Sequence, residues 1–158
     1  MRARTETALA LVVVLAASCG APPLPPRLAG LPRGRVISGR EAVRLVAQLH
    51  GQRYTPPDAL VAEYGRRREL KVWLARYPDF PSAYHDLERM VRALRSHPTP
   101  FLAPRQDRRE ANRWFTVGNG AHHLFWVSGT TLYWLEGEPE SVWAAAQELP
   151  PPSPARFL

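Results

Sequence analysis

The residues best suited to chemistry lie near the carboxyl end of the chain. His122 and His123 are adjacent, and Glu136 stands in the next predicted strand. An imidazole and a carboxylate together can transfer protons. The two histidines cannot bind one metal ion, because successive residues of a strand point to opposite faces. With a single cysteine in the chain, a zinc site built on cysteines and an intrachain disulfide are both excluded. We therefore predict neither a metal nor another cofactor.

Two further segments carry parts of catalytic motifs but not the whole of them. Ser128 precedes Gly129, yet it lacks the flanking glycine of a nucleophile elbow. Residues 118–120, Gly-Asn-Gly, form only the first half of a dinucleotide signature, and no helical pattern follows them. Both segments are typical of turns. The sequence thus contains no complete catalytic or nucleotide-binding motif, which favours a binding protein over an enzyme.

Arginine dominates the charge of the chain. The formal net charge is +7, from 21 basic and 14 acidic residues, and Lys71 is the one lysine. The arginines gather on two predicted surface loops, and those that would contact anions are Arg66, Arg67, Arg68, Arg105, Arg108 and Arg109, with Arg113 nearby. If the loops converge, they can bind phosphates or lipid headgroups. The alternative is that the charges are only solvated, since Glu69, Asp107 and Glu110 lie among them.

The amino-terminal residues have the pattern of an export signal. Arg2 and Arg4 precede an apolar run over residues 8–17, which is shorter than the roughly 20 residues that span a bilayer. Residues 15–19, Leu-Ala-Ala-Ser-Cys, resemble the lipobox of bacterial lipoproteins, with Ala16 where those proteins prefer leucine. This resemblance implies that residues 1–18 are removed and that Cys19 is acylated. An ordinary signal peptide cut nearby is the alternative.

The lipobox also implies a location and a set of partners. A lipid on Cys19 would hold the protein on a membrane of the bacterial cell envelope, facing outside the cytoplasm. There the membrane is one partner, an envelope protein or an apolar ligand is another, and nucleic acid is not expected. We predict a non-catalytic binding domain. One alternative is an envelope-acting enzyme or enzyme accessory that uses His122, His123 and Glu136, and a purely structural envelope protein is another.

Prolines divide the mature chain into three parts. Five of them fall within residues 19–35, which predicts a tether, because proline stops helices and cannot join a central strand. Residues 36–149 would form a single domain, and residues 150–158 would form a proline-rich tail. The domain is of ordinary size for one hydrophobic core.

Hydrophobic periodicity predicts the elements of this domain. Helices are expected within residues 38–51, 79–97 and 138–149, the first from a capping box of Ser38 with Glu41 and the second capped by Asp79. Strands are expected at residues 36–37, 58–64, 70–77, 114–117, 122–127 and 131–136. The order β-α-β-β-α-β-β-β-α predicts an α+β fold with a mostly antiparallel sheet, helices on one face, and a ferredoxin-like beginning.

The second hairpin, residues 122–136, is apolar on both faces. If helices cover only one face of the sheet, the other exposes aromatic side chains that suit a partner or an apolar ligand. The candidates for this binding face are Trp73, Trp126, Tyr133 and Trp134. The alternative is that the loop of residues 99–112 or the terminal segment covers this surface.

Overall fold

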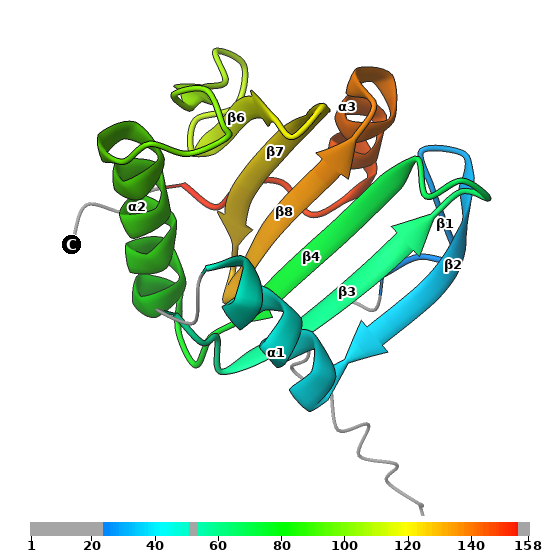
Figure 1. The fold of residues 1–158 in the computed structure, drawn as a ribbon, viewed down its shortest axis with the longest axis horizontal. Coiled ribbons are helices and arrows are strands. Elements are labelled where there is room, and N and C mark those ends of the chain that lie inside the picture. The colour runs from blue at the N-terminus through cyan, green and yellow to red at the C-terminus, as the bar shows by residue number, and fades with distance from the viewer. Residues whose placement is uncertain (1–23, 51–53, 155–158) are drawn as a thin grey trace, which may run out of the picture.

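The fold is one antiparallel sheet with three helices. The computed structural model describes residues 24–50 and 54–154, so Cys19 and the predicted signal lie outside the described residues. The eight strands follow the order β1-β2-β3-β4-β8-β7-β6-β5 (Figure 1). In chain order the elements are β1 (Arg27–Leu28), β2 (Leu31–Ser38), α1 (Gly39–Leu49), β3 (Asp58–Tyr64), β4 (Leu70–Arg76), α2 (Phe80–Ser96), β5 (Arg105–Gln106), β6 (Arg113–Gly118), β7 (Ala121–Ser128), β8 (Thr131–Gly137) and α3 (Pro139–Glu148).

The predicted α+β class is confirmed, but the ferredoxin-like beginning is wrong. Each pair of neighbouring strands in the sheet is antiparallel, including β2 and β3, which flank α1 in the chain. A ferredoxin-like βαβ unit would instead place the two strands that flank a helix in parallel. The order of the elements along the chain does not specify which strands pair. Here β3 pairs with β2, the strand that precedes it in the chain.

Helices cover both faces of the sheet, and not one face as predicted. On the front face, α1 packs on Ala59 and Val61, and α2 packs on Phe125, Val127 and Leu132. On the back face, α3 packs on a second layer that includes Val72, Leu124, Trp126, Tyr133 and Leu135. Because both faces of the central strands are apolar, each face needs a cover that excludes water.

The segment predicted as a tether belongs largely to the fold. Leu28 is 0% exposed, Leu24 is also buried, and β1 and β2 occupy one side of the sheet. The Tyr64 hydroxyl donates a hydrogen bond to the Pro25 carbonyl at 2.9 Å. Prolines are accepted here because strands near a sheet edge need fewer N–H donors. The remaining part of the predicted tether, residues 19–23, lies outside the described residues.

The proline-rich tail is likewise part of the structure over residues 150–154. The Trp126 indole N–H donates to the Pro150 carbonyl at 2.9 Å, and the Ser153 N–H donates to the Val127 carbonyl at 2.9 Å. In Figure 1 this red segment runs behind β7 and β8. Proline lacks an N–H donor but keeps its carbonyl, so the segment can still satisfy buried donors of the back face.

The helix starts agree in part with the capping patterns. The Asp79 carboxylate accepts a hydrogen bond from the Ser82 N–H at 2.8 Å, as predicted for α2. The capping box of α1 does not form: the Ser38 side chain makes no cap hydrogen bond, and Glu41 lies 3.4 Å from Arg35 instead. No helix within residues 24–50 or 54–154 is long and apolar enough to cross a membrane.

Candidate functional site

The front face carries a line of polar side chains that crosses four strands. Glu63 of β3 lies opposite Lys71 of β4, Lys71 lies opposite Glu136 of β8, and Glu136 lies opposite His123 of β7. We call these four residues the polar row. The neighbouring positions on the same face form an aromatic row of Trp73, Trp134 and Phe125. The register of the sheet therefore places the alternating charges of Glu63, Lys71 and Glu136 beside a line of aromatic rings.

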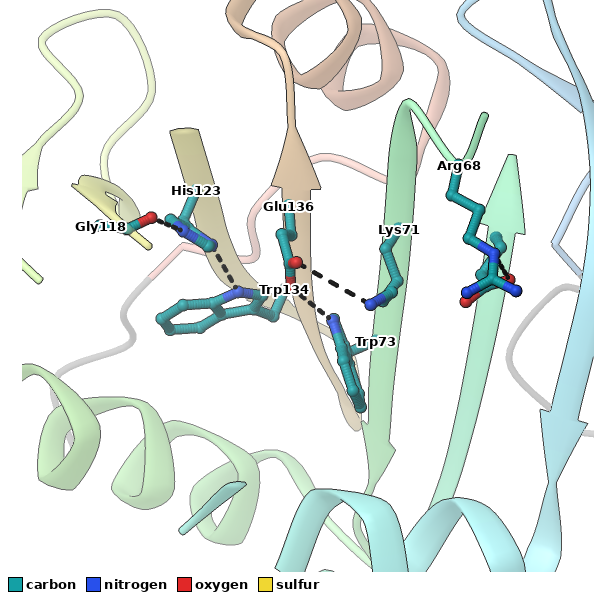
Figure 2. A network of polar contacts seen from close by, with 8 residues as sticks. Arg68, Lys71, Trp73, Gly118, His123, Trp134 and Glu136 are labelled. Atoms are coloured by element: carbon teal, nitrogen blue, oxygen red, sulfur yellow. Dashed lines mark hydrogen bonds and ion pairs between the residues drawn. The ribbon is translucent and has the colours of Figure 1, made fainter. Parts of the chain in front are cut away.

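Glu136 joins the two rows. Its carboxylate accepts a hydrogen bond from the Trp73 indole N–H at 3.3 Å and lies 3.9 Å from the Lys71 ammonium (Figure 2). The Lys71 ammonium is also 5.3 Å from the centre of the Trp73 ring, a cation–π arrangement. At the end of the row, the Arg68 guanidinium pairs with Glu63 at 3.1 Å. Trp73, Lys71 and Glu136 are half-buried, so solvent still reaches this part of the face.

His123 is buried at 2% exposure and uses both of its ring nitrogens. The Trp134 indole N–H donates to Nδ1 at 3.1 Å, and Nε2 lies 3.0 Å from the Gly118 carbonyl, which can only accept (Figure 2). These partners assign the proton of a neutral ring to Nε2. Burial lowers the pKa of His123, against the opposing effects of the Gly118 carbonyl and Glu136. His123 therefore holds Trp134 in place.

The residues of the enzyme alternative do not come together as a catalytic group. His122 and His123 lie on opposite faces of β7, as predicted, so only His123 faces Glu136. The lone pair that a general base needs on His123 is already bonded to Trp134. Among the described residues, no group of three histidine, cysteine, aspartate or glutamate side chains is placed to hold a metal ion.

The predicted aromatic binding face divides between the two sides of the sheet. Trp126 and Tyr133 are buried on the back face, under α3 and the tail, so they cannot contact a partner. Trp73 and Trp134 lie side by side on the front face and are half-buried. Trp134 stacks on Phe125 with ring centres 4.7 Å apart. Of the four predicted aromatic residues, Trp73 and Trp134 are thus the two that a partner can reach, and both lie on the front face.

The two arginine groups are not brought together. Arg66, Arg67 and Arg68 occupy the turn between β3 and β4, where all three are exposed. Arg105 lies on β5 at the far edge of the sheet, with Arg108 and Arg109 in the loop that follows. Strands β8, β7 and β6 separate β4 from β5. A single anion cannot bind both groups.

Arg113, next to the second group, has a structural role. Its Nε and Nη2 atoms lie 2.8 and 2.6 Å from one Asp107 carboxylate oxygen, and the two side chains are 4% and 7% exposed. Burial alone would raise the pKa of Asp107, but hydrogen bonds from the Arg109 N–H and from Arg113, with the charges of both arginines, outweigh burial and lower it. Arg113 is thus neutralised inside the fold and does not present its charge to a ligand.

Two arginines that no pattern in the sequence linked to the first group join it in the structure. Gly65 N–H in the β3–β4 turn donates to the Pro32 carbonyl at 2.9 Å, and Arg33 pairs with Tyr64 in the strand register. Arg27 lies opposite Pro32 on β1. We call the resulting group the basic corner; it consists of Arg27, Arg33, Arg66, Arg67 and Arg68, and all five are exposed. The sequence feature that could have predicted the basic corner is the pair of leucines, Leu24 and Leu28, among the prolines. Both leucines are buried and hold this segment against the sheet.

The basic corner lies where the described chain enters the fold. The Arg33 guanidinium donates a hydrogen bond to the Leu24 carbonyl. Nearby carboxylates are those of Glu63, Glu69, Glu138 and Glu148, the last of which accepts a hydrogen bond from the Ala29 N–H at 3.0 Å, so they are one fewer than the five arginines. The corner therefore carries a net positive charge close to residue 24.

Comparison with protein families, with curated proteins and with solved structures finds no match to this chain.

Proposed function

We propose that the protein is a bacterial lipoprotein, acylated on Cys19 and held outside the cytoplasm in the cell envelope, whose domain acts by binding. The observation that carries this proposal is the position of the basic corner. Leu24 is buried in the fold and follows Cys19 by five residues. Even a fully extended chain spans only about 17 Å over that distance. A lipid on Cys19 would therefore bring the corner to the membrane surface.

Electrostatics favours this orientation. A basic residue close to an anionic bilayer contributes about 1 kcal/mol to association. The five arginines of the basic corner would lie within reach of headgroups on one side of the domain, while Arg105, Arg108 and Arg109 lie at the far edge of the sheet. The membrane partner thus has a defined docking side.

The front face supports binding by the domain itself. Trp73 and Trp134 are held by hydrogen bonds to Glu136 and His123, so their rings lose little freedom when a partner packs on them. Rigid aromatic side chains beside charged groups are typical of the central residues of protein interfaces. An envelope protein or an apolar ligand with a polar edge is the partner that this surface fits.

Acylation is tested on the mature protein purified from membranes. We expect mass spectrometry to find a lipid on an amino-terminal Cys19, and we expect a Cys19→Ser variant to leave the membrane fraction. An unmodified amino terminus elsewhere in the chain would refute the lipoprotein proposal.

The docking side is tested with the unacylated Cys19→Ser protein and vesicles of phosphatidylglycerol and phosphatidylcholine. Replacing Arg66, Arg67 and Arg68 by glutamine should weaken binding about tenfold or more at low salt, and the parent's binding should decline as salt rises. The matched control replaces Arg105, Arg108 and Arg109 by glutamine, which removes the same charge from the far edge and should have little effect. Equal losses in the two variants would show that only net charge matters and would refute a docking side.

A further inference from the structure

A shallow hollow that is open to solvent lies outside the polar and aromatic rows. It lies between the segment before β3, the β4–α2 loop and the first turns of α2, and its volume is about 630 Å³. In Figure 1 the start of α2 lies beside the start of β3. Ligand sites in proteins commonly measure about 300 to 1,000 Å³. We call this site the tyrosine hollow; its polar residues are Tyr54, Thr55, Tyr77, Ser82, His85, Asp86 and Arg89.

Two tyrosine hydroxyls form the floor of the polar part. Tyr54 and Tyr77 are joined by a hydrogen bond between their hydroxyls. Burial raises the pKa of both tyrosines, and the negative charge of Asp86 raises them further. Both phenols therefore keep their protons across the physiological pH range, and they act as hydrogen-bonding groups without charge.

Asp86 and Arg89 form the charged side of the hollow. Their side chains pair at 2.6 Å, and the Arg89 guanidinium lies 4.9 Å from the centre of the Tyr54 ring. The stacking and the ion pair fix the guanidinium, so its remaining N–H groups have a defined direction. His85, on the same helix, is exposed at the rim. Carboxylate oxygens and guanidinium N–H groups are thus adjacent, which offers acceptors and donors side by side.

This composition limits the class of ligand. The carboxylate of Asp86 neutralises Arg89, so neither an anion nor a cation finds a complementary net charge. A fully apolar ligand would remove water from the charged Asp86 and Arg89 without offering a hydrogen bond in its place, which is costly. Pro57, Pro78 and Pro81 supply apolar walls beside these polar groups. A neutral molecule that has both hydroxyl groups and an apolar C–H surface meets all of these conditions.

We propose that the tyrosine hollow binds a neutral saccharide. Asp86 accepts hydrogen bonds from sugar hydroxyls, Arg89 donates to neighbouring hydroxyl oxygens, and the prolines pack against the C–H face of the ring. Each sugar hydroxyl both donates and accepts, which matches the adjacent acceptor and donor groups. The lining of this site includes neither the basic corner nor the front-face indoles. Saccharide binding there does not depend on acylation of Cys19.

Saturation-transfer NMR on the full chain tests the proposal, with maltose, cellobiose and diacetylchitobiose as separate probes. We expect transfer to at least one sugar. Asp86→Asn keeps the shape of the side chain, removes its charge and should weaken that sugar about tenfold or more, since hydrogen bonds to charged groups are the stronger ones. Tyr54→Phe keeps the ring, removes one hydroxyl and should weaken it severalfold.

Glu88→Gln is the matched control. Glu88 lies on α2 as well, pairs with Arg92 at 3.8 Å and is absent from the hollow. This variant should bind the sugar as the parent does. The amide resonances that shift on titration should be those of Ser82, His85 and Arg89.

Three results would overturn the proposal. The first is no transfer to any of the three sugars at millimolar concentration. The second is unchanged binding by Asp86→Asn in a protein that melts like the parent. The third is a set of shifts centred on Trp73 and Trp134, which would assign the sugar to the front face. Because the vesicle experiment uses different residues, its failure leaves this test unaffected.

Discussion

Replacing Asp107 by asparagine tests the buried ion pair that fixes the loop between β5 and β6. Asparagine keeps nearly the same volume but carries no charge. Arg113 would then remain 4% exposed, with no counter-ion for its guanidinium. Removing one partner of a buried pair typically costs about 3 to 5 kcal/mol, because the other charge stays out of water. A domain of this size has a total stability of only about 5 to 15 kcal/mol.

The loss is large enough to measure by thermal melting or urea unfolding. For a domain of this size, each kcal/mol corresponds to about 3 to 5 °C in Tm. Asp107→Asn should therefore lower the Tm by roughly 10 to 25 °C. A second variant, Asp107→Leu with Arg113→Met, removes both charges and should regain a large part of that loss, since an apolar pair avoids the desolvation cost.

Glu88→Gln provides the comparison with an exposed pair. Glu88 and Arg92 lie 3.8 Å apart with side chains 49% and 61% exposed, and such pairs contribute about 0 to 1 kcal/mol. Its Tm should stay within a few degrees of the parent, at about 3 to 5 °C per kcal/mol. If Asp107→Asn loses no more than Glu88→Gln, then the pair is solvated, and Arg113 returns to the group of arginines open to anions.

Two further predictions concern the amino-terminal strands and His123. Leu28→Ala should destabilise the domain by about 2 to 5 kcal/mol in urea unfolding, because Leu28 is fully buried. The control Leu102→Ala changes an exposed side chain and should have almost no effect. Equal effects of the two variants would mean that β1 does not pack on the sheet. Below pH 6.5 the unfolded chain protonates His123 before the folded one does, so the folded state loses stability as the pH falls. Melting curves of the parent should show this loss, and those of His123→Phe should lack that part of it; parallel curves would contradict the assignment.

The local elements could be predicted because their signals come from residues close together in the chain. The hairpin of β3 and β4 follows from two apolar strands around a turn, and Asp79 caps α2 by bonding an amide three residues away. The opposite directions of His122 and His123 follow from the pleat of any strand. These features depend on backbone geometry over a few consecutive residues, so the residue types at those positions are enough to predict them.

The candidate site could be predicted only in part. Trp73, Trp134 and Glu136 were identified by their residue types, but their meeting on one face depends on the β4–β8 pairing between segments more than fifty residues apart. The tyrosine hollow brings Tyr54, which precedes β3, together with Tyr77 after β4 and with the first turns of α2. No local sequence pattern links these three segments. Apolar periodicity assigns residues to a face without saying which strands will be neighbours.

Sequence alone determined the α+β class, the hairpins and the presence of two apolar sheet faces. Tertiary structure decided what covers them: α3 and the tail bury Trp126 and Tyr133, and Leu24 and Leu28 draw the proline-rich segment into the fold. It also separated the two arginine groups and paired Arg113 with Asp107. The physical reason is that burial depends on all the surfaces available to a side chain, and those surfaces come from segments that meet only when the sheet has formed.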